Sequence, residues 1–337
     1  MRRTVVALYA MLVAGNLAAW AWAAASFHAY PVLLGTAFLA YGFGLRHAVD
    51  ADHIAAIDSV TRTLMQRGRR PVAVGFWFSL GHSTVVILAS VAVAAAAGTI
   101  ERRFPAFRAL GGTVGTMVSA LFLFAVAALN LVVLKAVWRA FCNVRRGGRM
   151  AADALDPLLA QRGLLGRLFR PLFRLIGASW HMYPLGFLFG LGFDTASEIA
   201  LLGIAAAGAA KGMAIWSILI FPALFTAGMA LVDTTDSVLM VGAYGWAFVK
   251  PMRKLYYNLV ITLVSVLVAV VVGGIEALGL VADRLGLDGG VWRVIAALNG
   301  NFGGLGYVII AIFVLAWLVS ALIYRFRGFD EVEAEEG

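Results

Sequence analysis

The sequence predicts an all-α integral membrane protein with eight transmembrane helices, and three observations carry this prediction. Hydrophobic residues make up 62% of the 337 residues and charged residues only 13%, whereas soluble domains have about 25% charged residues. The mean hydropathy is +0.90. A helix needs roughly 20 mostly apolar residues to cross a bilayer. Eight such segments follow one another: 4–25, 32–60, 72–97, 112–141, 181–209, 213–241, 256–280 and 303–325.

The first segment resembles a secretory signal peptide, because Arg2 and Arg3 precede its apolar run. The run is longer than the roughly 7–15 apolar residues of a signal peptide, and Trp20 and Trp22 suit the aromatic belt of a membrane interface. We therefore interpret it as the first transmembrane helix. Cys142 is the one cysteine of the chain, which excludes an internal disulfide and a metal site built from several thiolates.

The formal net charge of +9 follows from where the basic residues lie. If eight helices alternate in direction, eighteen Lys and Arg residues fall on one side of the membrane and six on the other. The positive-inside rule then places both termini in the cytoplasm. Because topology explains the positive charge, we do not expect nucleic acid as a partner.

The helices divide into two groups. Residues 1–142 hold helices 1–4, residues 143–179 form a cytoplasmic linker, residues 180–327 hold helices 5–8, and residues 328–337 form an acidic tail. The tripeptide Phe-Gly-Leu precedes acidic residues in both groups, at residues 43–45 and 189–191. The helices that carry it would cross the membrane in opposite directions, which is the relation expected of a weak inverted repeat around a site at the midplane.

Residues 46–54 (RHAVDADHI), inside the second segment, are the most informative part of the chain. Ionisable side chains at membrane depth are expensive and mark binding sites or pathways. On a continuous helix His47, Asp50 and His53 share one arc of about 120°, and Asp52 points elsewhere. The alternative interpretation is that these groups only pair with one another, with Arg46 and with neighbouring helices.

Three further segments carry polar groups at a similar depth. His82 lies on the third segment beside Gly81, which permits close helix contact. The fifth carries Asp194 and Glu198, and the sixth carries Asp233 and Asp236, each pair on one helix face. Each acidic pair is also compatible with a proton relay or a buried hydrogen-bond network. Counted from the cytoplasmic helix ends, His53, His82, Asp194 and Asp233 fall within a slab about 8 Å thick.

Imidazole and carboxylate donors together favour a divalent transition metal. Soft Cu(I) prefers sulfur ligands, and Mg²⁺ or Ca²⁺ would favour oxygen alone. The donor set therefore indicates Ni, Co, Zn, Mn or Fe, and the chemistry of the residues alone does not choose among these.

Four motifs resemble those of the nickel/cobalt transporter (NiCoT) family of secondary permeases. They are RHAVDADHI at 46–54, FSLGHSTVV at 78–86, LGFDTASE at 191–198 and GMALVDTTD at 228–236, in that order along the chain. The resemblance implies high-affinity uptake of Ni²⁺ and/or Co²⁺ across the bacterial cytoplasmic (inner) membrane by a multi-pass protein, with the His and Asp residues of the second helix central to recognition.

The expected metal site combines these motifs. Its ligands are expected to be His47, Asp50, His53, His82, Asp194, Glu198, Asp233 and Asp236, with Arg46, Asp52 and Asn130 in support. We expect a transporter and not an enzyme, with the metal ion as substrate and no permanently bound cofactor. The chain lacks a G-x-x-x-x-G-K-[ST] phosphate loop, and no ATPase subunit is required because an inside-negative potential favours cation entry. The alternatives are efflux of the same ions, a membrane metalloenzyme, and a proton-coupled carrier that needs no metal.

Overall fold

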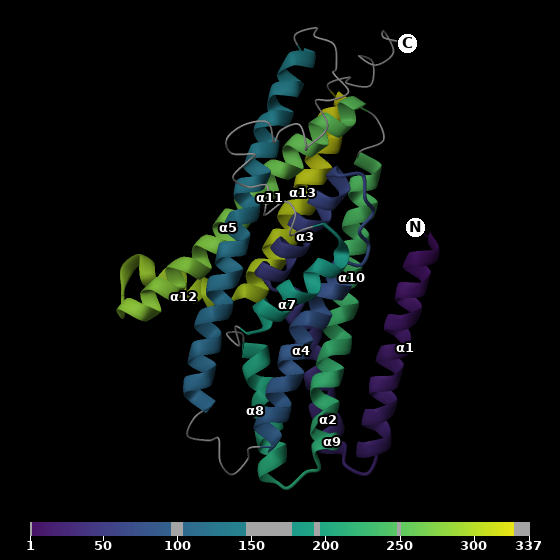
Figure 1. The fold of residues 1–337 in the computed structure, drawn as a ribbon, viewed down its shortest axis with the longest axis vertical. Helices are drawn as coiled ribbons and strands as arrows, with labels where there is room; N and C mark the ends of the chain where they lie inside the picture. The colour runs from purple at the N-terminus through teal and green to yellow at the C-terminus, as the bar shows by residue number, and fades with distance from the viewer. Residues whose placement is uncertain (1, 96–103, 146–176, 192–195, 248–250, 327–337) are drawn as a thin grey trace.

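The computed structural model describes residues 2–95, 104–145, 177–191, 196–247 and 251–326 (Figure 1). Within these ranges the regular elements are all helices, so the predicted all-α class is confirmed. They are α1 (Arg2–Phe27), α2 (Pro31–His47), α3 (Ala51–Gln66), α4 (Val74–Ala95), α5 (Phe104–Arg145), η3 (Ser179–His181), α7 (Met182–Gly190), α8 (Ala196–Ala210), α9 (Ile215–Ile218), α10 (Ile220–Ala247), α11 (Pro251–Leu285), α12 (Gly290–Asn299) and α13 (Phe302–Phe326).

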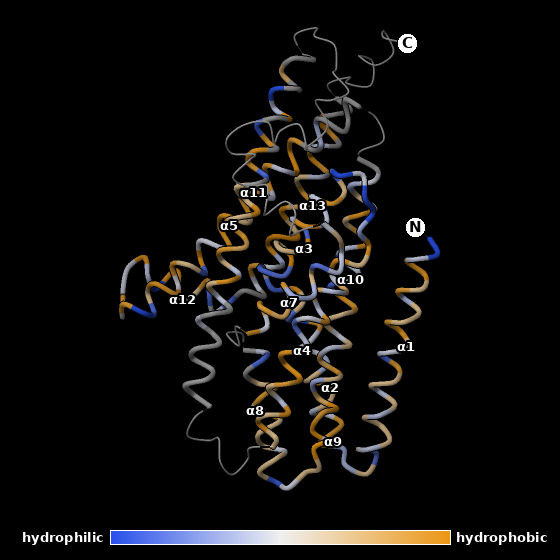
Figure 2. Tube along the Cα trace, in the orientation of Figure 1, coloured by the Kyte–Doolittle hydropathy of each residue, from blue (hydrophilic) through white to orange (hydrophobic). Residues whose placement is uncertain are grey.

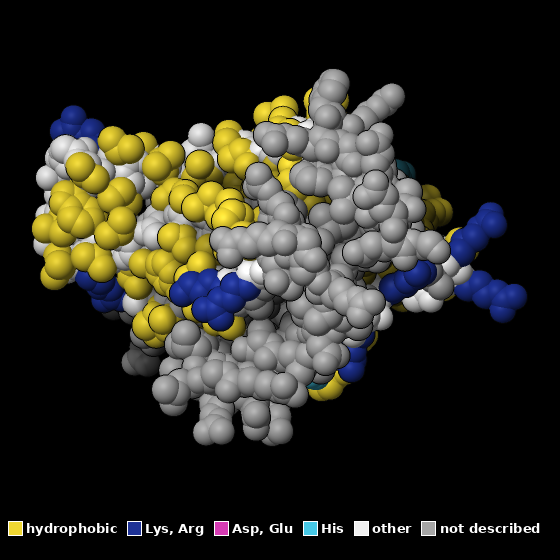
Figure 3. Space-filling view, turned by 90° about the horizontal axis from the view of Figure 1, so that it is seen from above, with side chains coloured by type: hydrophobic (Ala, Val, Ile, Leu, Met, Phe, Trp, Pro, Cys, Tyr) yellow, Lys and Arg dark blue, Asp and Glu magenta, His cyan; other side chains and the backbone are white. Residues whose placement is uncertain are grey.

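Five helices among the described residues are long and apolar enough to cross a membrane, and the number rises to seven if each of two bent pairs forms one span. The bent pairs are α2 with α3, at 50°, and α12 with α13, at 82°. Large apolar side chains such as Leu17, Leu267 and Leu315 are exposed on the outer helices, and Figure 3 shows hydrophobic side chains along one flank of the surface. These features make the chain a multi-pass membrane protein.

The fifth predicted segment is represented by α7 and α8, and residues 192–195 between them lie outside the described part of the chain. The same is true of residues 146–176 of the predicted linker and of the acidic tail. Helix α5 continues to Arg145, so the first residues of the predicted linker are helical.

The second predicted segment is not one continuous helix. Helix α2 ends at His47 and α3 begins at Ala51. Between them the Asp50 amide donates to the His47 carbonyl at 2.9 Å, and Asp50 has an extended backbone at φ −67° and ψ 148°. The prediction that His47, Asp50 and His53 share one face of a continuous helix was therefore wrong, although the imidazoles of His47 and His53 do lie close together.

Helix α3 lies at the centre of the bundle. It contacts α4, α5, α10, α11 and α13, and every residue from His53 to Met65 is buried. Figure 2 shows hydrophilic stretches where α3, α7 and α10 meet inside an otherwise apolar bundle. Arg62 follows the predicted end of the second segment, residue 60, and was therefore expected in a loop on the cytoplasmic side. That expectation was wrong, because Arg62 lies within α3 and is fully buried.

Glycines let the helices around the site approach to backbone contact. A Cβ atom on Gly81 of α4 would lie 1.9 Å from the Tyr183 carbonyl oxygen, and one on Gly186 of α7 would lie 2.0 Å from the Phe78 carbonyl oxygen. Reciprocal contacts of this kind hold α4 against α7, as small residues commonly do in membrane helix pairs. On α2, a Cβ atom on Gly44 would similarly lie 2.1 Å from the Phe225 carbonyl oxygen of α10.

Candidate metal site

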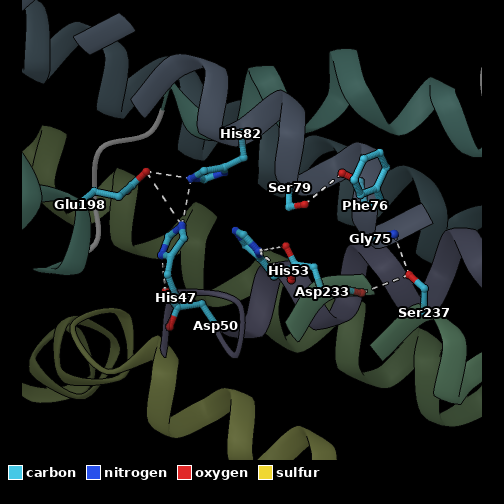
Figure 4. Close-up of polar contacts among 10 residues, drawn as sticks. All are labelled: His47, Asp50, His53, Gly75, Phe76, Ser79, His82, Glu198, Asp233 and Ser237. Carbon is cyan, nitrogen blue, oxygen red and sulfur yellow. Dashed lines mark hydrogen bonds and ion pairs between the residues drawn. The ribbon is translucent and has the colours of Figure 1, made fainter. Parts of the chain in front are cut away.

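Three buried imidazoles meet at the break between α2 and α3. His47 is the last residue of α2, His53 lies in the first turn of α3, and His82 lies in the middle of α4. Their ring centroids are 4.6 to 5.0 Å apart, and one nitrogen from each ring lies within 4.8 Å of the other two. The three residues are at most 3% exposed. Figure 4 shows the three rings turned toward one another.

Two ring nitrogens and one carboxylate oxygen form the tightest part of this cluster. The Nε2 atoms of His47 and His82 are 2.9 Å apart, and Glu198 Oε1 on α8 lies 2.9 Å from His82 Nε2 and 4.0 Å from His47 Nε2. Ligands on one ion with bonds of about 2.1 Å lie about 3.0–3.4 Å apart. The spacing of these three atoms is therefore close to that of ligands sharing one cation.

Carboxylates hold two of the rings from their other side. Asp50 Oδ2 lies 3.0 Å from His47 Nδ1, and both oxygens of Asp233 on α10 lie 3.4 Å from His53 Nδ1. A carboxylate on the second ring nitrogen fixes the tautomer and orientation of a ligand imidazole and makes it a better donor. Asp50 reaches His47 because the helix break places it beside the end of α2 instead of one turn along it.

Apolar side chains enclose the imidazoles. The ring of Phe78 lies 4.8 Å from that of His53, nearly perpendicular to it, and the ring of Phe225 lies 5.5 Å from that of His47. Excluding water strengthens electrostatic interactions inside a site. The C-terminal end of α2 adds a partial negative charge, which favours a cation.

The other predicted residues are placed differently. Asp194 lies outside the described residues. Asp236 is one turn beyond Asp233 on α10, and its Oδ2 atom is buried without a hydrogen-bond partner among the described residues. Asp52 is half-buried and Arg46 is exposed. Asn130 of α5 is buried, with its Nδ2 atom likewise unpartnered in the described part of the chain.

Sequence reasoning missed a second polar group on α3, formed around Asp58 and Arg62, which are both fully buried. Asp58 binds the hydroxyl groups of Tyr244 on α10 and Ser265 on α11. The available signal was an Asp and an Arg one turn apart, five residues after His53, in a segment that was already rich in ionisable residues.

The comparisons with known proteins agree on one family. Residues 33–323 match the family model NicO, described as high-affinity nickel-transport protein. The chain is 61% identical to the "High-affinity nickel transport protein" of Cupriavidus necator over 98% of this chain and 95% of that protein. It is 47% identical to the "Nickel transporter NixA" of Staphylococcus aureus over 88% and 86% of the two chains.

A third relative differs in its metal. The "Cobalt transport protein NhlF" of Rhodococcus rhodochrous is 43% identical over 87% of this chain and 83% of that protein. No solved structure matches the chain. Since the family model covers most of the sequence and the relatives are aligned over most of their own lengths, the chain belongs to the NicO family of high-affinity nickel-transport proteins.

Proposed function

We propose that this protein takes up Ni²⁺, and also Co²⁺, through the site formed by His47, His53, His82 and Glu198. The observation that carries the proposal is the meeting of three buried imidazoles and a carboxylate from four different helices inside a membrane bundle. Nitrogen and oxygen donors of this kind suit both ions. The relatives are named for nickel and for cobalt, which supports the same pair of substrates.

The residues divide into two roles in this proposal. His47, His53, His82 and Glu198 contact the ion. Asp50 and Asp233, which the sequence predicted as ligands, take a different role in this proposal: they orient imidazoles and balance the double positive charge of the ion. Asp194 and Asp236 remain predicted ligands, which would join the site when the ion is bound. Arg46, Asp52 and Asn130 remain predicted supporting residues.

The driving force is the membrane potential. An inside-negative potential favours inward movement of a doubly charged ion by about 4.6 kcal/mol per 100 mV, taking about 2.3 kcal/mol per charge. This suffices for secondary transport without ATP. We also propose that the protein has eight transmembrane helices, with α7 and α8 forming one broken span. Both termini would lie in the cytoplasm, and the protein would reside in the bacterial inner membrane.

The site lies where α2 ends and α3 begins, and a second interrupted segment, α7 followed by α8, brings Glu198 to it. Discontinuous helices that meet at a central site are a common architecture of secondary transporters, in which one helical group rocks against the other. The ligands come from α2, α3 and α4 in the first predicted half and from α8 in the second. Rocking of the halves would therefore pull the ligand set apart and release the ion.

Uptake of radioactive nickel into cells that express the protein tests the proposal. His47→Ala should abolish uptake, because it removes one of the three imidazole nitrogens that meet at the site. His28→Ala is the matched control, since His28 lies on the surface at the end of α1, where its ring bonds only the Ala25 carbonyl oxygen among the described contacts. Equal uptake by the two variants at equal protein levels would refute the proposed site.

The same cells separate uptake from the two alternatives. An exporter would lower the nickel content of the cells and make its deletion mutant hypersensitive to the metal, whereas an importer raises the content. A membrane metalloenzyme would retain the metal in reconstituted vesicles without moving it across the bilayer. Accumulation of nickel inside the vesicles, driven by an inside-negative potential, is the result expected of the proposed transporter.

A further inference from the structure

The Asp58 cluster is a second buried polar group that metal binding does not require. It consists of Asp58 and Arg62 on α3, Tyr244 on α10, and Thr262 and Ser265 on α11. Asp58, Arg62 and Thr262 are 0% exposed, and Ser265 and Tyr244 are 1% and 4% exposed. An Asp and an Arg at such depth are expensive compared with apolar residues of the same volume, so their presence calls for a functional reason.

Hydrogen bonds of this cluster tie α3 to two other helices. Tyr244 and Ser265 donate to different oxygens of the Asp58 carboxylate, Ser265 at 2.6 Å. Arg62 Nη1 donates to Thr262 Oγ1 at 3.0 Å. The Nε and Nη2 atoms of Arg62 are buried and have no hydrogen-bond partner among the described residues. This guanidinium group therefore retains donors that another arrangement of the helices could use.

The cluster lies between the metal site and the far end of α3. His53 is in the first turn of α3, and Asp58 follows five residues later, about 7.5 Å along the helix axis. Helix α10 makes the same connection, because Asp233 bonds His53 at the site and Tyr244 bonds Asp58 in the cluster. Helix α3 is buried from His53 to Met65, so an ion that leaves the imidazoles along this helix would move through the interior of the bundle, toward the level of the Asp58 cluster.

We propose that the Asp58 cluster is the inner gate of the transporter, closed by the hydrogen bonds of Asp58 to Tyr244 and Ser265. An apolar seal resists both water and ions, whereas a carboxylate can exchange each hydrogen bond from the protein for one from water at a modest net cost. Opening would free the Asp58 carboxylate to interact with the departing ion. Arg62, one turn further along α3, would neutralise that carboxylate and prevent a divalent ion from remaining there.

The inference rests on the proposed transport function, but its test does not require metal. Ser79→Cys provides a reporter, because Ser79 is fully buried on α4, one turn before His82 of the site. Cys142→Ser removes the native thiol. A charged, membrane-impermeant thiosulfonate then measures access to the reporter from each side of the membrane, in intact cells and in inverted membrane vesicles.

Weakening the gate should increase access from one side. Tyr244→Phe and Ser265→Ala each remove one donor to Asp58 and should raise the modification rate in inverted vesicles by about tenfold, the effect expected for a hydrogen bond to a charged acceptor. The rate in intact cells should not change. Tyr41→Phe is the matched control, since it removes the 2.9 Å bond of Tyr41 to Asn16 between α2 and α1, away from the cluster.

The outcomes are distinct. Three results would overturn the proposed gate. The modification rates of both variants could stay within twofold of the parent, Tyr41→Phe could show the same increase, or the increase could be equal from both sides of the membrane. If Tyr244→Phe does not fold, Ser265→Ala decides alone. Nickel uptake by the parent is measured separately. Its absence would refute the transport function, whereas a one-sided increase in thiol access would still identify the Asp58 cluster as a barrier.

Discussion

Replacing Gly81 by alanine should damage the proposed metal site without changing any of its proposed ligands. The new Cβ atom would lie 1.9 Å from the Tyr183 carbonyl oxygen, whereas real Cβ atoms essentially never approach closer than 3.0 Å. Helices α4 and α7 must therefore separate by at least about 1 Å. Overpacking of this kind lowers the free energy of unfolding by about 1–3 kcal/mol.

The same shift moves His82, which is the next residue on α4. A displacement of about 1 Å would lengthen the 2.9 Å contact between His82 Nε2 and Glu198 Oε1 to nearly 4 Å, beyond hydrogen-bond range. Losing one contact to a charged group costs about 1.5–3 kcal/mol. We therefore expect the affinity for Ni²⁺ to fall by about tenfold or more.

Equilibrium binding of Ni²⁺ to the purified protein, together with thermal unfolding in detergent, measures both effects. Gly203→Ala is the matched control, because a Cβ atom on Gly203 of α8 would meet nothing within 4 Å. Alanine there should be neutral or stabilising, since it favours the helix by about 1 kcal/mol relative to glycine. If Gly81→Ala binds nickel as tightly and unfolds at the same temperature as Gly203→Ala, the reasoning from close helix contact is refuted.

Three further predictions concern the site itself. Glu198→Gln should weaken Ni²⁺ binding by at least about tenfold in equilibrium dialysis, because it removes the negative charge beside His82; unchanged affinity would exclude Glu198 as a ligand. Asp50→Asn should weaken binding by about 10- to 100-fold, less than His47→Ala, because Asp50 acts through the His47 ring; the reverse order would make Asp50 the direct ligand. Binding of Ni²⁺ should weaken as the pH falls, because protons compete with the metal for the imidazole nitrogens; an affinity that stays constant down to the pH at which the protein unfolds would argue against imidazole ligation.

The helical fold could be predicted from the sequence, and so could the three imidazoles that the structure brings together. The apolar segments are long and separated by charged residues. Inside a bilayer no water is available to bond the backbone, so such a segment pairs its N–H and C=O groups with one another in a helix. Ionisable residues stand out sharply in such segments. His47, His53 and His82 were therefore recognisable as candidate site residues before their contacts were known.

The helix break at residues 48–50 could not be predicted in the same way. The segment contains neither Pro nor Gly at this point, and its residues are compatible with a continuous helix. What favours the break is tertiary packing: a Cβ atom on Gly306 of α13 would lie 1.5 Å from the Val49 carbonyl oxygen, so another helix occupies space directly beside the turn.

The position of Arg62 could not be predicted either. Arg62 follows the predicted end of the second segment, residue 60, which suggested a loop, but other helices of the bundle surround α3 and Thr262 accepts a hydrogen bond from Arg62. Burial of this kind depends on which helices are neighbours, and the order of apolar segments does not specify that.

From the amino-acid sequence alone the chain was recognisable as a helical membrane protein, and its imidazoles and carboxylates as candidates for a functional site, because a bilayer makes every ionisable residue conspicuous. How those groups are paired emerges from the three-dimensional packing of the helices. His47 meets Asp50 across a break, His82 meets Glu198 from a distant helix, and Asp58 binds Tyr244 and Ser265. Such contacts depend on helix ends, crossings and backbone approaches of a few ångströms, which are set by packing between segments far apart in the chain.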